Sequence, residues 1–193
     1  MSARETRDHI VEAADDLFYR QGYENTSFAD IAGAVRISRG NFYYHFKTKD
    51  RILDAVIEAR LAKTRAMLDR WEREGETAAD RIRCFIRILI VNRASIERYG
   101  CPVGTLMTEL TKLGHSAQTE ATKLFILFRS WLTRQFEQLG CGGKADDLAL
   151  HLLAMSQGVA TLINAFQDEA FTEREVARME AWLETRAQDA TGG

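Results

Sequence analysis

Residues 26–50 read TSFADIAGAVRISRGNFYYHFKTKD, and this stretch decides the fold. Ser27 and Asp30 have the spacing of a capping box, which predicts that a short helix begins here. Ser38 offers a second N-cap after only a brief interruption. The stretch therefore predicts two short helices joined by a tight turn, with the second helix over residues 39–45.

Helical patterning continues on both sides of this stretch. Upstream, one apolar stripe recurs with helical spacing and consists of Ile10, Ala13, Ala14, Leu17 and Phe18. Gly22 follows as a C-cap, so this first helix is expected to end near Gln21. Downstream, Thr48 is placed to cap a helix from Lys49 to about Glu74, which would be on the order of 40 Å long.

The remainder of the 193-residue chain also favours helices. It contains the only proline, Pro102, and no convincing alternation of apolar and polar residues. Amphipathic segments follow one another at residues 82–90, 116–139, 145–166 and 173–188. The helical pattern breaks near Tyr99–Pro102, between the first and second of these segments. We predict an all-α fold: a three-helix helix-turn-helix head over residues 1–48, joined by one long helix to a larger helical bundle, the two domains being 1–48 and 49–193.

Charge is distributed unevenly along the chain. The net charge is −2, but residues 36–51 hold five basic residues against one acidic residue, which is +4 and leaves −6 elsewhere. A basic window on an acidic body is typical of a surface that contacts nucleic acid. On charge alone, a solvated charged turn explains the window equally well.

The residue types in the second short helix favour DNA. Arginine pairs with guanine edges and asparagine with adenine, while glycine lets a phosphate approach the backbone. Tyrosine, histidine and lysine reach phosphates or thymine methyl groups, and hydroxyl groups at a helix N-terminus can meet a phosphate. The predicted DNA contacts are Thr26, Ser27, Ser38, Arg39, Gly40, Asn41, Tyr43, Tyr44, His45, Lys47 and Lys49.

These residues, in register over about 25 positions and preceded by Phe18, Gly22 and Tyr23, closely resemble the DNA-binding signature of TetR-family transcriptional regulators. The resemblance implies a homodimer whose two heads dock in successive major grooves of a palindromic operator. It also implies that Phe42 and Phe46 belong to the core of the head. The alternative is a helical bundle with a coincidentally basic loop.

The resemblance also implies that the last two long helices dimerise. The segment 148–166 suits an interface because it is apolar on more than one face and carries small residues, namely Ala149, Ala154, Gly158 and Ala160. An ordinary buried helix would look similar. A ligand cavity is expected inside the body, lined by Met67, Trp71, Phe85, Met107, Phe125, Phe128 and Trp131, although each of these also fits a plain core position.

Cys101 carries a sharper hypothesis. Residues 99–110 resemble a Gly-Cys-x-x-Gly-x-x-x-x-Glu-Leu segment found in one branch of the family, some of whose members respond to electrophiles or oxidants through that cysteine. A thiol directly before a helix, with Arg98 nearby, would have its thiolate favoured. The alternative is a small structural cysteine. Cys84 is expected to be inert, and Cys141 has no evident base beside it.

Other classes of protein fit the sequence poorly. The charged N-terminus and the three widely spaced cysteines favour a cytoplasmic protein without a secretory signal, and residues 148–167 suit a buried helix better than a membrane span. The four scattered histidines and the missing phosphate-binding and nucleophile motifs favour no metal, no cofactor and no enzyme. We therefore predict an effector-responsive repressor, with an activator still open. The rival is a thiol-dependent enzyme or adaptor with a helix-turn-helix-like head.

Overall fold

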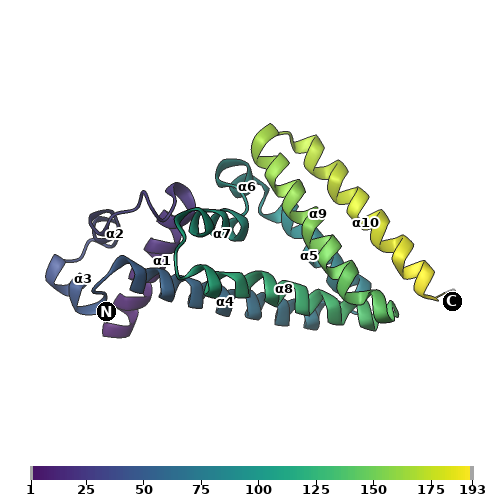
Figure 1. Cartoon of the computed structure of the whole chain (residues 1–193), viewed down its shortest axis with the longest axis horizontal. Coiled ribbons are helices and arrows are strands. Elements are labelled where there is room, and N and C mark those ends of the chain that lie inside the picture. The colour runs from purple at the N-terminus through teal and green to yellow at the C-terminus, as the bar shows by residue number, and fades with distance from the viewer. Residues whose placement is uncertain (1, 192–193) are drawn as a thin grey trace. The chain divides into compact units, whose positions relative to one another are not determined.

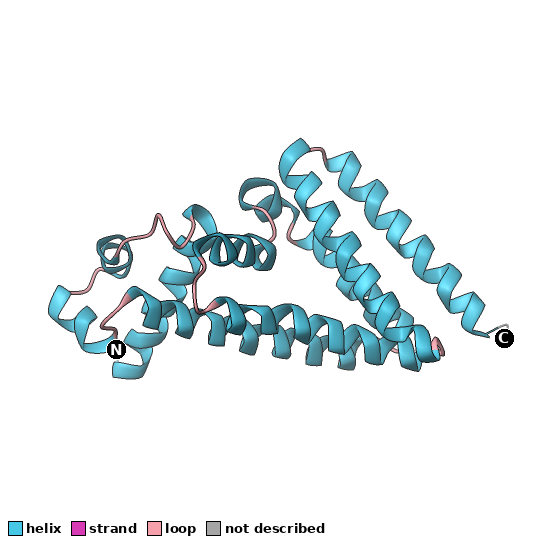
Figure 2. Cartoon of the chain, in the orientation of Figure 1, coloured by secondary structure: helices cyan, strands magenta, loops and turns pink. Residues whose placement is uncertain are grey.

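The structure is a computed structural model that describes residues 2–191, and every regular element among them is helical (Figures 1 and 2). The predicted all-α fold is confirmed. The helices are α1 (Ala3–Gln21), α2 (Phe28–Val35), α3 (Arg39–His45), α4 (Lys49–Glu74), α5 (Ala78–Val91), α6 (Arg93–Tyr99), α7 (Pro102–Leu113), α8 (Gln118–Gln138), the short 3₁₀ helix η1 (Gly142–Lys144), α9 (Ala145–Phe166) and α10 (Glu169–Thr191).

The caps predicted from the sequence fix the boundaries of the N-terminal helices. Ser27 and Asp30 form the complete capping box of α2, and the Ser38 hydroxyl accepts the Asn41 N–H at 3.3 Å. The Thr48 hydroxyl accepts the Arg51 N–H at 3.2 Å in the first turn of α4. Gly22 ends α1 with a φ of +89°, a conformation that glycine adopts without strain.

Helix boundaries in the C-terminal part differ from the sequence prediction. The last helix, α10, begins at Glu169 and not at residue 173, and an unpredicted break divides the segment before Tyr99. Residues 82–99 were expected to be interrupted only at their end, but α5 ends at Val91 and α6 begins at Arg93. Asn92 lies at φ −100° and ψ 9°, and its carbonyl accepts the N–H groups of Ser95 and Ile96. A residue in this bridge conformation interrupts the helical ladder, which hydrophobic periodicity alone does not reveal.

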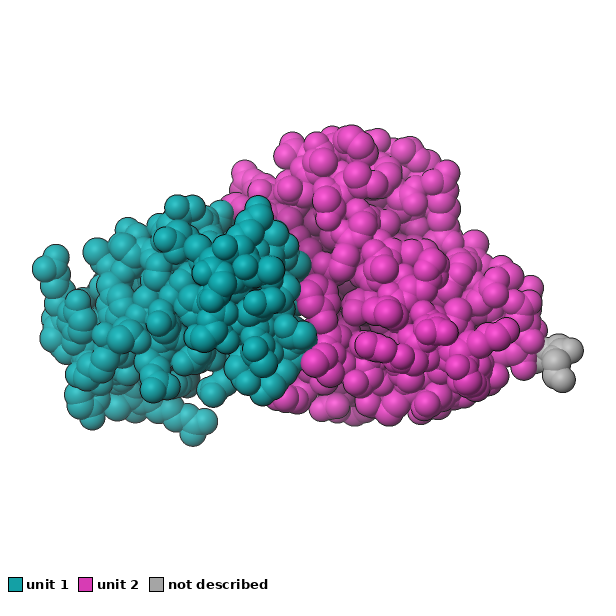
Figure 3. Space-filling model, in the orientation of Figure 1, with its two compact units in different colours: residues 1–63, 102–124 teal, residues 64–101, 125–193 magenta. Residues whose placement is uncertain are grey.

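The contacts of the chain group it into two compact units, coloured separately in Figure 3. The first unit comprises residues 1–63 and 102–124, so it holds α1 to α3, the first part of α4, all of α7 and the start of α8. Its core includes Ile10, Ala14, Ile31, Phe42, Ile52 and Leu53, each at most 1% exposed. The domain division at residue 48 stays a prediction, and the unit around the helix-turn-helix includes more of the chain than that division does.

The second unit comprises residues 64–101 and 125–193. Within it, α5 packs against α10, and α6 packs against α9. Helices α9 and α10 form an antiparallel pair (Figure 1), because Gln167 takes a left-handed conformation at φ 52° and turns the chain sharply. The largest fully buried side chains of this unit are Trp131, Phe136, Ile82 and Ile86.

Candidate nucleic-acid interface

The turn between α2 and α3 is built by one left-handed residue. Arg36 has φ 55° and ψ 40°, and its N–H donates to the carbonyls of Ala32 and Gly33 at 3.1 and 3.3 Å. Only Ile37 then separates this C-cap from Ser38, the N-cap of α3. The tight turn fixes α3 against α2 in the manner of a helix-turn-helix.

The two faces of α3 differ sharply in exposure. Phe42 is 1% exposed and Phe46, directly after the helix, is 3% exposed, so both belong to the core as predicted. The opposite face carries aromatic rings into solvent, with Tyr44 at 73% and Tyr43 at 49% exposure. Of the remaining predicted contacts, the exposed ones are Ser27, Ser38, Arg39, Gly40, Asn41 and Lys47, and His45 is half-buried.

Gly40 has no internal reason to be a glycine. A Cβ atom added there would meet nothing within 4 Å, and the residue does not need a positive φ. Glycine in a helix is destabilising by about 0.5–1 kcal/mol relative to alanine. Gly40 therefore makes α3 less stable although no internal clash requires a glycine there. The missing side chain leaves room for a DNA backbone to approach α3 closely.

Two predicted contacts, Thr26 and Lys49, have side chains that bond to the backbone of the segment before α2. Thr26 is 1% exposed, and its hydroxyl donates to the Gly22 carbonyl at 2.6 Å. The Lys49 ammonium donates to the carbonyls of Tyr23 and Glu24 at 2.9 and 3.3 Å, and it lies 4.2 Å from the centre of the Tyr23 ring. Both residues therefore stabilise the segment that precedes α2.

Ionised side chains reinforce this segment. The Tyr23 hydroxyl donates to Asp50 at 2.5 Å, and this bond holds the pKa of the Asp50 carboxyl below its usual range. Burial raises the pKa of the Tyr23 phenol, with the hydrogen bond to Asp50 acting in the same direction. At the start of α2, the hydrogen bond from the Ser27 hydroxyl lowers the pKa of Asp30. Asp30 thus keeps a negative charge on the N-terminus of α2, the helix end at which a phosphate contact is predicted.

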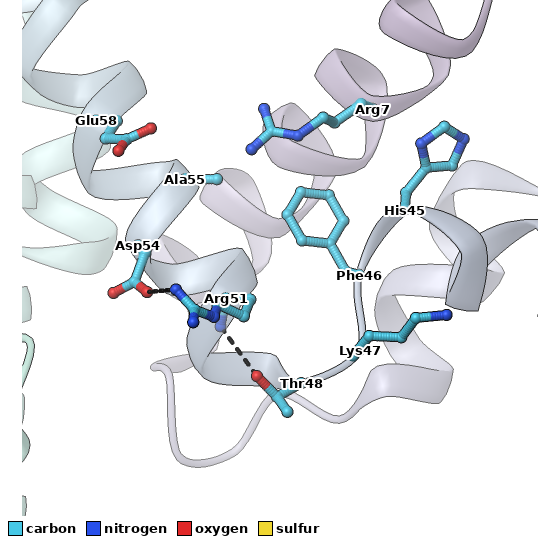
Figure 4. A pocket seen from close by; sticks show the side chains of 9 residues that line it. All are labelled: Arg7, His45, Phe46, Lys47, Thr48, Arg51, Asp54, Ala55 and Glu58. Carbon is cyan, nitrogen blue, oxygen red and sulfur yellow. Dashed lines mark hydrogen bonds and ion pairs between the residues drawn. The ribbon is translucent and has the colours of Figure 1, made fainter.

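A cavity of about 380 Å³ lies beside α3, and basic side chains line it together with the acidic Asp54 and Glu58 (Figure 4). Lys47 and Arg51 line it from the loop and from α4, and Arg7 joins them from α1. The Arg7 guanidinium lies over the Phe46 ring at 5.0 Å from its centre, and Arg51 lies 3.8 Å from the Asp54 carboxylate. No pattern in the sequence marks Arg7, because only the folded chain brings α1 to the end of α3.

The predicted cavity residues fall in both units. In the second unit, the rings of Trp71 and Trp131 lie 5.7 Å apart and those of Phe85 and Phe128 lie 5.6 Å apart. All four are at most 8% exposed, while the Met67 and Phe125 side chains of the same unit are half-buried. Among residues 2–191, the Trp131 indole N–H is one of two buried side-chain donors without an acceptor. Met107 belongs to the first unit, where the Thr122 hydroxyl lies 3.9 Å from its sulfur.

The three cysteines are all half-buried. Cys101 directly precedes α7, which begins at Pro102, so the expected place of this thiol before a helix is correct. Burial is the main cause that raises the pKa of the Cys84 and Cys141 thiols above the usual range. A raised pKa disfavours the thiolate, which makes both side chains poor nucleophiles.

A helix-turn-helix whose second helix exposes basic, amide and aromatic side chains defines a DNA-binding regulator. Comparisons with known proteins give the particular family. Residues 10–56 match the sequence signature described as "Bacterial regulatory proteins, tetR family". These residues therefore form a TetR-type DNA-binding domain, and the chain as a whole is similar to transcriptional regulators of the TetR family, which are not enzymes.

Relatives match well beyond the head. An uncharacterised HTH-type transcriptional regulator of Lactococcus lactis is 28% identical over 169 residues, 86% of each chain. The HTH-type transcriptional repressor DhaR of a Mycobacterium species is 26% identical and covers 80% of this chain and 77% of its own. A TetR transcriptional regulator from Legionella pneumophila superposes with a TM-score of 0.80 at 28% identity, covering 90% of this chain and 94% of its own.

Proposed function

We propose that the chain is a cytoplasmic, homodimeric repressor that binds palindromic operator DNA through α3 and releases it when an effector binds. The observation that carries this proposal is the exposed face of α3, where Arg39, Gly40, Asn41 and Tyr44 stand free of the core. These are the side chains that read base edges and meet phosphates in a major groove. Arg7 and Arg51 extend the same basic surface toward the flanking backbone.

The dimer interface is proposed on α9. Its outer face carries five exposed residues spaced four apart, Leu150, Ala154, Gly158, Leu162 and Phe166. Such a row packs against a second helix by interdigitating ridges, and its small central residues permit a close approach. Two other small residues, Ala149 and Ala160, are buried within the chain itself. Residues 142–166 are also long and apolar enough to cross a membrane. Burial of the exposed face of α9 against a second copy of the chain would account for the same apolar composition.

The effector is proposed to be a small molecule that binds beside the aromatic cluster of the second unit, or an electrophile that modifies Cys101. In support of the first, the Trp131 N–H is buried without an acceptor, and a ligand with a carbonyl or similar acceptor would satisfy it. In support of the second, Cys101 directly precedes α7. Either effector must bind one conformation of the dimer better than the other to cause release.

A gel-shift experiment tests the proposal. The purified dimer is incubated with DNA that flanks its own gene, with and without a thiol-alkylating agent, beside a Cys101→Ser variant. Release of the wild type but not of Cys101→Ser identifies an electrophile sensor. Binding that ignores alkylation points to the non-covalent ligand. No specific binding of the wild type to any flanking DNA contradicts the function itself.

A further inference from the structure

The backbone between α1 and α2 is held by two oppositely charged side chains. The carboxylate of Glu109, from α7, accepts the N–H groups of Tyr23 and Glu24, both at 2.9 Å. On the other side, the Lys49 ammonium donates to the carbonyls of the same two residues. All four backbone groups of this dipeptide are therefore bonded to an ionic partner, and such charge-assisted bonds are about twice as strong as neutral ones.

Gly22 makes room for this arrangement. A Cβ atom added at Gly22 would lie only 2.9 Å from one Glu109 carboxylate oxygen, and the residue has a φ of +89°. Any other residue would be strained there and would push the carboxylate away. The glycine next to the dipeptide thus permits both the end of α1 and the approach of Glu109.

The N-terminal end of α7, at Pro102, is also attached to the first unit. Arg60 is 9% exposed, and its guanidinium bonds to the Asp15 carboxylate of α1 at 2.6 Å and to the Pro102 carbonyl at 2.7 Å. Beyond α7, the His115 ring lies 5.1 Å from the Tyr23 ring. Because Pro102 directly follows Cys101, α7 runs from the expected sensor segment to the dipeptide that precedes the helix-turn-helix.

We infer that Glu109 is a positioning residue for operator binding: its carboxylate fixes Tyr23 and Glu24, and through them sets the placement of α2 and α3. Glu109 holds these two residues from α7, within the first unit, and its proposed role requires no contact with DNA. Any displacement of α7 would pull the carboxylate from both N–H groups at once. The inference rests on the proposed DNA-binding function and adds a residue of the first unit that holds the helix-turn-helix in place.

The test compares Glu109→Gln with a control, Glu120→Gln. Glu120 is an exposed glutamate of the same unit and pairs with Lys123, one helical turn away. The glutamine side chain has the same shape as glutamate but only one acceptor oxygen. Its NH₂ group would face one of the two backbone N–H groups of Tyr23 and Glu24, and two donors facing each other repel. We expect Glu109→Gln to lower affinity for operator DNA about ten-fold or more, since bonds to charged groups are the strong ones. We expect its affinity for random DNA, and its dimerisation, to stay at wild-type values.

Hydrogen exchange gives a second, local readout. The Tyr23 and Glu24 amides should exchange faster in Glu109→Gln and at wild-type rates in Glu120→Gln. Wild-type operator affinity in Glu109→Gln would overturn the inference. An equal loss of operator and random DNA binding together with a lower melting temperature would also overturn it, because that pattern is plain unfolding of the head. A wild type that binds no operator would refute the proposed function instead.

Discussion

Lys47 and Lys49 stand two residues apart, yet the structure gives them different tasks. The Lys47 side chain is exposed, whereas the Lys49 ammonium is bonded to two carbonyls and lies over the Tyr23 ring. Replacing Lys49 by methionine removes both bonds and the cation–π contact, which should lower the free energy of unfolding by about 2 kcal/mol. For a chain of this length, the melting temperature should fall by about 4–8 °C.

The matched variant Lys47→Met should leave the melting temperature unchanged and alter DNA binding instead. Loss of one phosphate contact reduces the slope of log K against log salt by about 0.9. The assays are thermal unfolding followed by circular dichroism and a salt titration of operator binding for both variants. If Lys49→Met melts like the wild type and its salt slope falls by about 0.9, Lys49 is a phosphate contact and has no structural role in the head.

Three further outcomes follow from the geometry. Gly40→Ala should raise the free energy of unfolding by about 0.5 kcal/mol and weaken operator binding, as measured by denaturant unfolding and gel shift; unchanged DNA affinity would contradict the close approach. Gly158→Glu should turn the dimer into a folded monomer in analytical ultracentrifugation, and a dimer that persists would move the interface off α9. The Asp50 carboxyl has its pKa lowered in the folded state, so its contribution to stability is present above about pH 4 and lost as the pH falls further. In acid unfolding, Asp50→Asn should flatten that part of the curve, and an unchanged curve would exclude the Tyr23 bond as its source.

The sequence predicted those parts of the molecule that depend on neighbours along the chain. Caps at Ser27, Ser38 and Thr48 act over three residues, while the core positions of Phe42 and Phe46 were implied by the family resemblance. Local pattern was therefore enough for the helix boundaries of the helix-turn-helix, and the resemblance added which side chains of α3 are buried.

Contacts between distant segments could not be predicted in this way. Glu109 lies 86 residues from Tyr23, and the sequence marked it only as part of a family-like segment, without a role. Lys49 matched a DNA-contacting position of the family, but the charge of a side chain does not say which carbonyls lie within its reach. The attachment of α7 to the head likewise depends on packing. In the sequence only Gly22 hints at it, and the fold is needed to show that this glycine has a positive φ and lies against Glu109.

The variant Tyr44→Ala examines the claim that the exposed face of α3 binds operator DNA. Tyr44 is 73% exposed, so its removal should not disturb the fold or the dimer. Fluorescence anisotropy on operator DNA should give an affinity at least about ten-fold weaker for Tyr44→Ala than for the wild type, at equal dimer content. Equal affinity of the two proteins for the operator, or loss of the dimer together with binding, would contradict the claim.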